Sequence, residues 1–297
     1  MRTLVIKTAS LGDVVRTTPL LRALDGEVVW VVSKSAAPLL PRIARLTLVP
    51  AENAENLAGQ NFDLMLSLEE DPGLARVAAK VRAKMAQGCF MPGRGGFTYT
   101  ADAAPWFDMS LISRLDRQEA DRLKGENNRS WQDFLFHMAG RRFSGEEYWI
   151  EPPPDLPTVQ PDLVGIEARA GTRWPAKRWP RFEELERRLL GNGWKTIRFE
   201  QKPTIEEHIR QVARCAVIVT GDSLTMHLAL ALQKPTVAIF TCTSPHEIHD
   251  YARLTRIISP LWKRHFYTTD AAAAPGTAVS SDEVYLAITR CLENAPR

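Results

Sequence analysis

A carboxylate and a glycine follow the first apolar run of the chain. Residues 4–24 read LVIKTASLGDVVRTTPLLRAL, where the apolar run 4–6 ends in a short polar loop and Asp13 comes directly after Gly12. A carboxylate at the start of a helix can accept hydrogen bonds from local N–H groups as a cap. The same carboxylate can act as a general base if it lies within about 3 Å of the proton that it removes. Both roles are open for Asp13, and they are compatible.

A second polar cluster lies at residues 220–232, which read TGDSLTMHLALAL. The pattern predicts a strand that runs into Asp222 and a helix that begins at Ser223 or Leu224. The free N–H groups of a helix start form an anion site, and the hydroxyls of Ser223 and Thr225 add donors. The alternative is that Asp222 or Ser223 only caps the helix and nothing binds. His227 lies on the same helix, and a lone histidine there is more often structural than a ligand.

A basic loop follows a predicted strand in the second half of the chain. Residues 169–180 read RAGTRWPAKRWP and contain four cations and two Trp-Pro pairs. Such cations can neutralise a diphosphate leaving group without a metal ion. The alternative is a solvated basic surface loop.

Other common motifs are missing from the sequence or are weak in it. The loop TASLGD after the first strand has one glycine and lacks the GxGxxG fingerprint, which argues against a nicotinamide or flavin enzyme. The phosphate-binding P-loop pattern is missing too. Residues 246–250, HEIHD, contain metal-ligating residue types, but without further ligands a solvated loop is favoured over a metal site. The four cysteines are scattered and form no CxxC pair, so we expect reduced, mostly buried thiols.

The composition is that of an ordinary globular protein. Hydrophobic residues make up 44% and charged residues 25% of 297 residues, a length for which two domains of roughly 150 residues are expected. The net charge of +3 suits an anionic small ligand and does not suggest a nucleic-acid-binding protein. No apolar run approaches the roughly 20 residues of a membrane span, and none at the N-terminus resembles a signal peptide. We therefore expect a cytoplasmic protein.

The elements that must position these residues alternate between strands and helices. In the first half the pattern predicts a helix at 14–24 with a kink at Pro19, a short helix at 36–44, an irregular and mainly surface loop at 91–110 within a less regular stretch to 130, and a helix at 131–138 closed by Gly140. Strands are predicted at 3–7, 27–33, 46–49, 63–68 and 83–90.

A proline-rich segment, EPPPDLPTVQP at 151–161, marks the predicted boundary between domains 1–150 and 162–297. The second half alternates more regularly, with strands predicted at 164–168, 194–200, 217–220, 236–240 and, as an edge strand, 256–258, and helices at 182–190, 205–215, 224–232 and 281–293. This alternation predicts two Rossmann-like α/β domains with parallel sheets. Ligands of such sheets bind outside the carboxyl ends of the strands, where Asp13, the basic loop and Asp222 would lie.

Three motifs together resemble glycosyltransferase family 9, the ADP-heptose:lipopolysaccharide heptosyltransferases. They are SLGDVVRTTPLLRAL near the start, AKRWP after the linker, and GDSLTMHLALALQKPTVAIF followed by TSP. The resemblance implies a GT-B architecture, in which two Rossmann-like domains face a central cleft. It implies that the first domain binds the acceptor and the second binds the nucleotide sugar.

The resemblance also implies a function. It points to an inverting, metal-independent transfer of a heptose or related sugar, from ADP-heptose, to a lipopolysaccharide core or another glycan. No cofactor and no metal are expected. The partners would be the nucleotide-sugar donor, a glycan or lipid-linked acceptor, and the cytoplasmic face of the inner membrane as a peripheral contact. Two alternatives stay open: a family relative that glycosylates a small metabolite or a protein, and a non-catalytic nucleotide-sugar-binding protein.

Site residues follow from the same resemblance. Asp13 matches the proposed general base of the family, and its loop supplies the expected acceptor contacts Ser10, Gly12 and Arg16. The diphosphate-binding cation maps to Arg173 or Lys177, and the acidic contact to the ribose maps to Glu200. The expected donor-binding residues are Thr172, Arg173, Lys177, Glu200, Asp222, Ser223, Leu224, Thr225 and His227.

Two residues depart from the family pattern. Leu224 and Thr241 stand where the family usually has glycine, so both bring bulk to places where backbone is expected to approach the nucleotide. The motifs therefore indicate the family more firmly than they indicate which nucleotide sugar is the donor.

Overall fold

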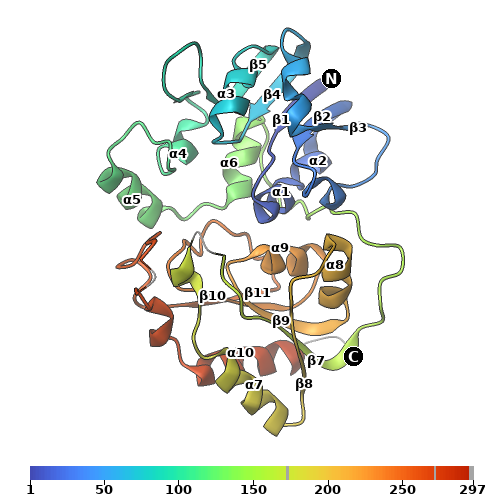
Figure 1. Ribbon diagram of the computed structural model, residues 1–297, viewed down its shortest axis with the longest axis vertical. Coiled ribbons are helices and arrows are strands. Elements are labelled where there is room, and N and C mark those ends of the chain that lie inside the picture. Colours follow the sequence, from blue (N-terminus) through green and yellow to red (C-terminus); the bar gives the residue numbers. More distant parts are fainter. Residues whose placement is uncertain (172–173, 271, 294–297) are drawn as a thin grey trace. The chain divides into compact units, whose positions relative to one another are not determined.

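The computed structural model describes residues 1–171, 174–270 and 272–293. The chain forms two compact units, Met1–Glu151 and Pro152–Arg297, each of which is described here by itself (Figure 1). The division falls within the proline-rich segment. The first strand of the second unit begins at Gln160, so the last two residues of the predicted linker belong to a strand.

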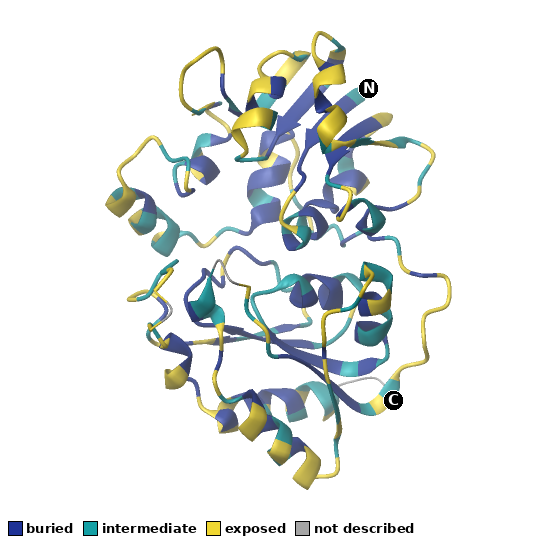
Figure 2. Ribbon diagram, viewed as in Figure 1, coloured by how far each residue is buried: buried dark blue, intermediate teal, exposed yellow. Residues whose placement is uncertain are grey.

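The first unit is built on a six-stranded sheet with the order β3-β2-β1-β4-β5-β6. Every neighbouring pair is parallel except β5 and β6. Residues 4–6 of the central strand are fully buried, which explains why this strand reads as an uninterrupted apolar run (Figure 2). The strands are β1 (Arg2–Ile6), β2 (Glu27–Val32), β3 (Leu46–Pro50), β4 (Asn61–Ser67), β5 (Arg82–Phe90) and β6 (Thr98–Tyr99).

Near the N-terminus the first unit has two short helices, where the sequence predicted one helix with a kink at Pro19. Helix α1 (Leu11–Thr17) ends before Pro19, and α2 (Leu20–Ala23) begins after it. Helix α6 (Trp131–Met138) packs on α1, and the indole Nε1 of Trp131 donates to Thr17 Oγ1 over 3.1 Å. Gly140 follows α6 with a φ of 66°, the left-handed conformation expected of a helix-closing glycine. The other helices are α3 (Pro72–Ala78), α4 (Ala104–Phe107), α5 (Arg117–Glu126) and the 3-10 helices η1 (Ala37–Leu39) and η2 (Ala51–Leu57).

Two predictions for the first unit are wrong. Residues 36–44 form only the short η1, because Pro38 and Pro41 lack the N–H groups that an α-helix would need. Residues 91–110, predicted as a surface loop, contain β6 and α4, and Trp106 and Phe107 are buried. The Trp106 ring lies 4.4 Å from that of Trp131, so this segment packs on the helix that supports α1.

The second unit is built on a five-stranded parallel sheet with the order β11-β10-β9-β7-β8. Strand β11 lies at the edge, as predicted. The strands are β7 (Gln160–Glu167), β8 (Lys195–Arg198), β9 (Cys215–Gly221), β10 (Thr236–Phe240) and β11 (Leu254–Ile258). The helices are α7 (Phe182–Gly191), α8 (Ile205–Ala213), α9 (Leu224–Ala231), α10 (Ser281–Glu293) and the 3-10 helices η3 (Pro175–Lys177) and η4 (Pro275–Ala278).

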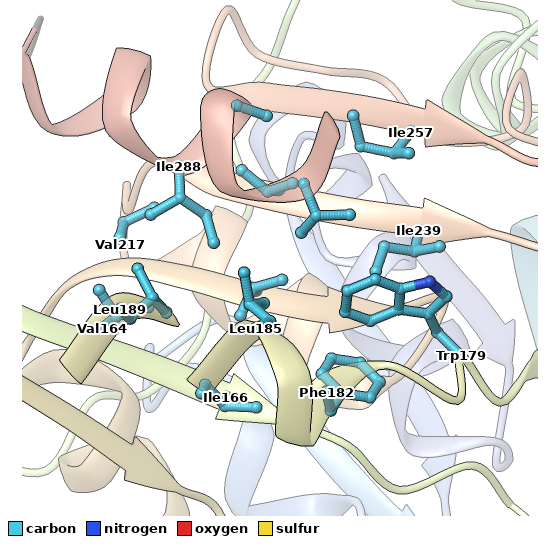
Figure 3. Packing of buried hydrophobic residues seen from close by; sticks show 14 of the residues in the cluster. Val164, Ile166, Trp179, Phe182, Leu185, Leu189, Val217, Ile239, Ile257 and Ile288 are labelled. Atoms are coloured by element: carbon cyan, nitrogen blue, oxygen red, sulfur yellow. The ribbon is translucent and has the colours of Figure 1, made fainter. Parts of the chain in front are cut away.

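Helices cover both faces of this second sheet. Residues of α7 and α10, among them Leu185 and Ile288, pack with Val164 on one face (Figure 3). Residues of α8 and α9 pack with Leu163 on the other face. The neighbours Leu163 and Val164 point to opposite faces because side chains alternate along a strand. Burial on both faces leaves the carboxyl edge of the sheet as the place for polar side chains.

Candidate active site

A cavity lies at the switch point of the second sheet. In chain order the strands β7 to β11 have the arrangement 2-1-3-4-5, whose strand order reverses between β7 and β9. Ligands of open α/β sheets bind at this point, outside the carboxyl ends of the strands. A cavity of about 220 Å³ lies there, lined by Glu167, Ala168, Arg169, Ala170, Gly171, Trp174, Lys177, Arg178, Phe182, Gly221, Asp222, Ser223 and Leu224.

An ion pair joins the basic loop to the end of β9 in this cavity. The Nζ atom of Lys177 lies 2.7 Å from Oδ2 of Asp222 and donates to the Asp222 carbonyl oxygen over 3.3 Å. Burial raises the pKa of the Asp222 carboxyl, but the Lys177 ammonium outweighs burial and holds that pKa below its usual value. The carboxylate is therefore ionised at neutral pH and fixes the ammonium at the cavity wall.

Thr241 helps to hold Lys177 in place. Its Oγ1 donates to the carbonyl oxygen of Ala176, the residue before Lys177, over 2.7 Å, and its side chain is buried. The bulk of Thr241 is thus taken up by contact with η3. Of the two residues that depart from the family pattern, only Leu224 borders the cavity.

Helix α9 begins at the cavity wall. Ser223 is its N-cap residue, but the Ser223 side chain makes no capping hydrogen bond to the helix, and its Oγ lies 2.8 Å from Thr220 Oγ1. The N–H groups of the first turn are orphan donors at the positive end of the helix dipole. The helix start is therefore suited to an anion, as the sequence predicted.

Other predicted donor residues lie elsewhere. Thr225 is buried behind the wall, where its Oγ1 donates to Glu167, and His227 is buried close enough for its charge to act on Asp222. Glu200 is exposed, and its charge acts on Arg169. These three residues are not among those that line the cavity. Thr172 and Arg173 lie outside the described residues. Of the two candidates for the diphosphate-binding cation, the structure therefore describes only Lys177.

Two residues of this site were missed by the sequence analysis. Glu167 ends the apolar strand β7 and is buried at the cavity wall, and His208 of α8 is buried in contact with Thr225, which donates to Glu167. The available signal was an acidic residue at the end of an otherwise apolar run, LVGIE. A carboxylate in such a place needs a partner, which the neighbouring Arg169 supplies.

The Asp13 loop lies at the switch point of the first sheet, where the order reverses between β1 and β4. The Asp13 Oδ2 accepts from the backbone N and the Oγ of Ser10 at 3.3 Å and 3.1 Å. Its Oδ1 lies 2.8 Å from Arg16 Nη2. The carboxylate thus fixes the start of α1, and 32% of its side chain is exposed to solvent. Capping and general-base chemistry remain compatible for this partly exposed carboxylate.

Arg16 is held by aromatic rings as well as by Asp13. Its guanidinium carbon lies 5.5 Å from the ring centroid of Trp106 and 5.3 Å from that of Trp131. Only 13% of its side chain is exposed. This packing makes Arg16 a positioning partner of Asp13. Of the other predicted acceptor contacts, Ser10 is exposed and Gly12 is buried.

Glu69, which the sequence analysis did not single out, anchors the loop between β1 and α1. Its Oε2 accepts from the N and Oγ1 of Thr8 at 2.8 Å and 2.9 Å and from the N of Ala9 at 3.0 Å. Lys7 Nζ lies 3.4 Å from the same oxygen. The adjacent Glu70 is half-buried, and burial raises the pKa of its carboxyl. The Asp13 loop is therefore tied by a carboxylate to the segment that follows the neighbouring strand β4.

The segment 246–250 is not the solvated loop that was expected. His246 is exposed, but Glu247 and Ile248 are buried, and the Asp250 carboxylate pairs with Arg256. Among the residues that the structure describes, no group of three or more His, Cys, Asp or Glu side chains is arranged to hold a metal ion. In the same part of the chain, no helix has the length and apolar character of a membrane span.

The sequence and the fold are similar to those of known heptosyltransferases. Glycosyltransferase family 9 (heptosyltransferase) matches residues 201–271. The lipopolysaccharide heptosyltransferase 2 of Salmonella typhimurium is 30% identical over an aligned segment that covers 29% of this chain and 34% of that protein. The chain thus matches about a third of the length of this relative.

Solved structures share the fold over nearly the whole chain. A family 9 glycosyltransferase from Veillonella parvula has a TM-score of 0.65 at 17% identity and covers 98% of this chain and 97% of its own. The Escherichia coli heptosyltransferase WaaC with ADP-2-deoxy-2-fluoro heptose has a TM-score of 0.60 at 17% identity, and the match covers 98% of this chain and 99% of that one. The structure of WaaC with ADP has the same TM-score and identity, and the match covers 98% of this chain and 100% of that one.

The predicted α/β fold with GT-B architecture is confirmed by these structures. The predicted central cleft between the two units stays a prediction. The family match includes the start of α9, with Asp222, Ser223 and Leu224 at the cavity wall. Residues 201–271 thus match glycosyltransferase family 9, the family that the sequence motifs resemble, and nearly the whole chain shares the fold of solved heptosyltransferases.

Proposed function

We propose that the protein is an inverting, metal-independent glycosyltransferase that moves a heptose from ADP-heptose to a lipopolysaccharide core or a related glycan. The observation that carries this proposal is the cavity at the β7/β9 switch point, where Lys177 is fixed on Asp222 beside the start of α9. An ammonium and the orphan N–H groups of a helix start together suit a diphosphate. The family match over residues 201–271 supports a nucleotide sugar as the bearer of that diphosphate.

The choice of ADP-heptose as donor is supported by relatives. WaaC of E. coli has been solved with ADP and with a fluorinated ADP-heptose, and its fold covers nearly the whole of this chain. The sequence relative from S. typhimurium is a lipopolysaccharide heptosyltransferase. Both relatives support heptosyl transfer during lipopolysaccharide synthesis as the reaction of this chain.

The proposed reaction is a single displacement. The oxygen of an acceptor hydroxyl forms a bond to the anomeric carbon of the heptose, the bond from that carbon to the diphosphate oxygen breaks, and ADP leaves. Asp13 takes the proton of the hydroxyl as general base, for which its partly exposed carboxylate is suited. The negative charge that grows on ADP is balanced by Lys177 and the first turn of α9.

The same charge balance supports the proposal that no metal ion is needed. Three cations, Arg169, Lys177 and Arg178, line the cavity together with two carboxylates, Glu167 and Asp222. Fixed cations that face a leaving group lower the barrier in the way a bound divalent ion would. We propose that the acceptor is lipid-linked and that the protein works at the cytoplasmic face of the inner membrane.

Nucleotide binding tests the donor. Thermal unfolding is followed with ADP, UDP, GDP and TDP at about 100 times the expected Kd, where one bound ligand stabilises the fold by about 2.7 kcal/mol. We expect a rise in Tm with ADP that is the same with magnesium and with EDTA. A rise with another nucleotide alone would replace the donor, and a rise that needs magnesium would contradict metal independence. If no nucleotide raises Tm, the proposed donor site is wrong.

A further inference from the structure

The carboxylate of Glu167 is the centre of a buried hydrogen-bond network at the cavity wall. Its Oε1 accepts from the backbone N of Arg169 at 3.0 Å and from Arg169 Nε at 2.8 Å. Its Oε2 accepts from Arg169 Nη2 at 2.6 Å and from Thr225 Oγ1 at 3.0 Å. Each oxygen therefore accepts two hydrogen bonds from the protein, so the carboxylate is fully hydrogen-bonded although its side chain is only 5% exposed.

The guanidinium of Arg169 binds Glu167 side-on and leaves one edge for a ligand. Its Nε and Nη2 donate to the two carboxylate oxygens, so the Nη1 amino group lies on the side away from Glu167. The Arg169 side chain is 46% exposed and lines the cavity, whereas its partner is buried. Arg169 is therefore fixed by Glu167 on one edge of its guanidinium, and the other edge is available to a ligand in the cavity.

The same carboxylate connects Arg169 to the start of helix α9. Thr225 lies in the first turn of α9, and its single hydroxyl hydrogen goes to Glu167. His208 Nε2 lies 2.9 Å from Thr225 Oγ1 and must therefore be the donor of that hydrogen bond. The guanidinium and the N–H groups of the helix start, two groups that favour anions, are thus fixed to one buried carboxylate.

The placement of a carboxylate here would oppose an anionic ligand unless it served another purpose. Glu167 and Asp222 both line the cavity, and each is matched by a cation, Arg169 at 2.6 Å and Lys177 at 2.7 Å. The two pairs follow the ends of β7 and β9, the strands on either side of the switch point. The cavity is therefore flanked by two cations, each fixed by its own carboxylate.

We propose that Arg169 is a second cation that binds the diphosphate of the nucleotide sugar, together with Lys177, and that Glu167 is the residue that positions it. This inference rests on the proposed function, since it names a residue for the same diphosphate. Arg169 donates from Nη1 to a phosphate oxygen, and Glu167 holds the guanidinium plane so that this edge faces the cavity.

Isothermal titration of ADP, with adenosine as the uncharged comparison, tests the role of Arg169. A hydrogen bond to a charged group is worth enough for Arg169→Ala to weaken ADP binding by about 10- to 100-fold, while adenosine binding stays the same. Arg169→Lys keeps the charge but cannot bind Glu167 side-on and also present a second amino group, so we expect it to recover less than half of the lost affinity for ADP. Arg198→Gln is the matched control, because Arg198 pairs with Glu186 on the surface of the same unit.

Glu167→Gln separates positioning from charge. If Glu167 acted only as a nearby negative charge, its removal would tighten the binding of ADP. A positioning role predicts weaker binding, by about 3- to 10-fold, because one amide oxygen cannot hold the guanidinium as two carboxylate oxygens do. The Tm of each variant without ligand shows that it is folded at the temperature of the titration.

The outcomes distinguish the role of Arg169 and Glu167 from the proposed function itself. Unchanged ADP binding by Arg169→Ala, or unchanged or tighter binding by Glu167→Gln, would overturn this inference while the proposed function stands. An equal loss of ADP and adenosine binding would also overturn it, because a general loss of structure would then explain the effect. If the unsubstituted chain binds no ADP at all, the proposed donor and this inference both fail.

Discussion

The Lys177 ammonium lies 2.7 Å from the Asp222 carboxylate, with about a fifth of each side chain exposed. This pair links the loop after β7 to the start of α9 across the switch point of the second sheet. The ionised Asp222 carboxylate fixes the ammonium of Lys177. One of the three ammonium N–H groups donates to the carboxylate and another donates to the Asp222 carbonyl oxygen. The remaining capacity is available to an anion in the cavity.

Removal of this ammonium is expected to affect turnover strongly. Lys177→Ala takes a cation from the leaving group and leaves the Asp222 carboxylate unpaired beside it. We expect kcat to fall by about 10²–10³-fold, the effect of losing one preorganised electrostatic group, and the affinity for ADP to fall as well. The control is Lys195→Ala, since Lys195 pairs with Asp162 and is 67% exposed. Near-normal kinetics in Lys177→Ala would show that Lys177 does not contact the diphosphate.

The contacts of Arg16 predict a role in kcat. Because Arg16 packs against Trp106 and Trp131 and pairs with Asp13, Arg16→Ala should release the Asp13 carboxylate from its fixed orientation. We expect kcat to fall by at least about 10-fold, as for other misplaced catalytic groups, with ADP binding unchanged. Steady-state kinetics with varied acceptor make the comparison. A rise in the KM for the acceptor at constant kcat would instead favour the acceptor-binding role expected from the sequence.

Asp13 itself offers a sharper test of the chemistry. Asp13→Asn keeps the size of the side chain and a carbonyl oxygen for the Ser10 contacts, but it cannot accept the proton of the acceptor hydroxyl. We expect turnover to fall by about 10²–10⁴-fold, while ADP binding by the other unit is kept. The two are measured on one preparation, by transfer rate and by titration. Full turnover in Asp13→Asn would remove the general-base assignment.

Much of the fold could be predicted because its strands are buried on both faces. Such strands read as apolar runs, and β1, β7, β9 and β10 were found within a few residues of their ends. Residues 91–110 could not be predicted in this way. Gly, Pro and aromatic residues suggested a loop, whereas Trp106 is buried through contacts with Trp131, a partner that is distant in sequence.

The positions of site residues could be predicted where these residues directly follow a strand. Asp222, Ser223 and Leu224 follow β9 directly, and the structure places all three at the cavity wall. The sequence predicted that the Thr225 hydroxyl donates a hydrogen bond to the ligand, because hydroxyls at helix starts often do. In the structure this hydroxyl donates to Glu167. The partners of Glu167 come from the loop after β7 and from α9, and β-strand periodicity says nothing about such contacts.

Acid should weaken the network around His208. Burial lowers the pKa of this histidine, which faces the charges of Glu167, Arg169 and Lys202. The unfolded chain therefore takes up a proton at a higher pH than the folded chain does. The stability that comes from this site is present above the ordinary histidine pKa of about 6.5 and is lost as the pH falls below it.

His208→Gln tests this dependence, because glutamine can keep the N–H donor to Thr225 without titrating. We expect the fall in Tm between pH 7.5 and pH 5.5 to be smaller in this variant than in the unsubstituted protein. An identical dependence in the variant and the unsubstituted protein would show that His208 does not titrate differently in the folded chain.

The most direct test of the central claim is the transfer reaction itself. ADP-heptose and a lipopolysaccharide acceptor with a truncated core are incubated with the protein in the presence of EDTA, and the acceptor is analysed by mass spectrometry. The account predicts the addition of one heptose with release of one ADP, at a rate that magnesium does not raise. An acceptor of unchanged mass, under conditions in which the protein binds ADP, would contradict it.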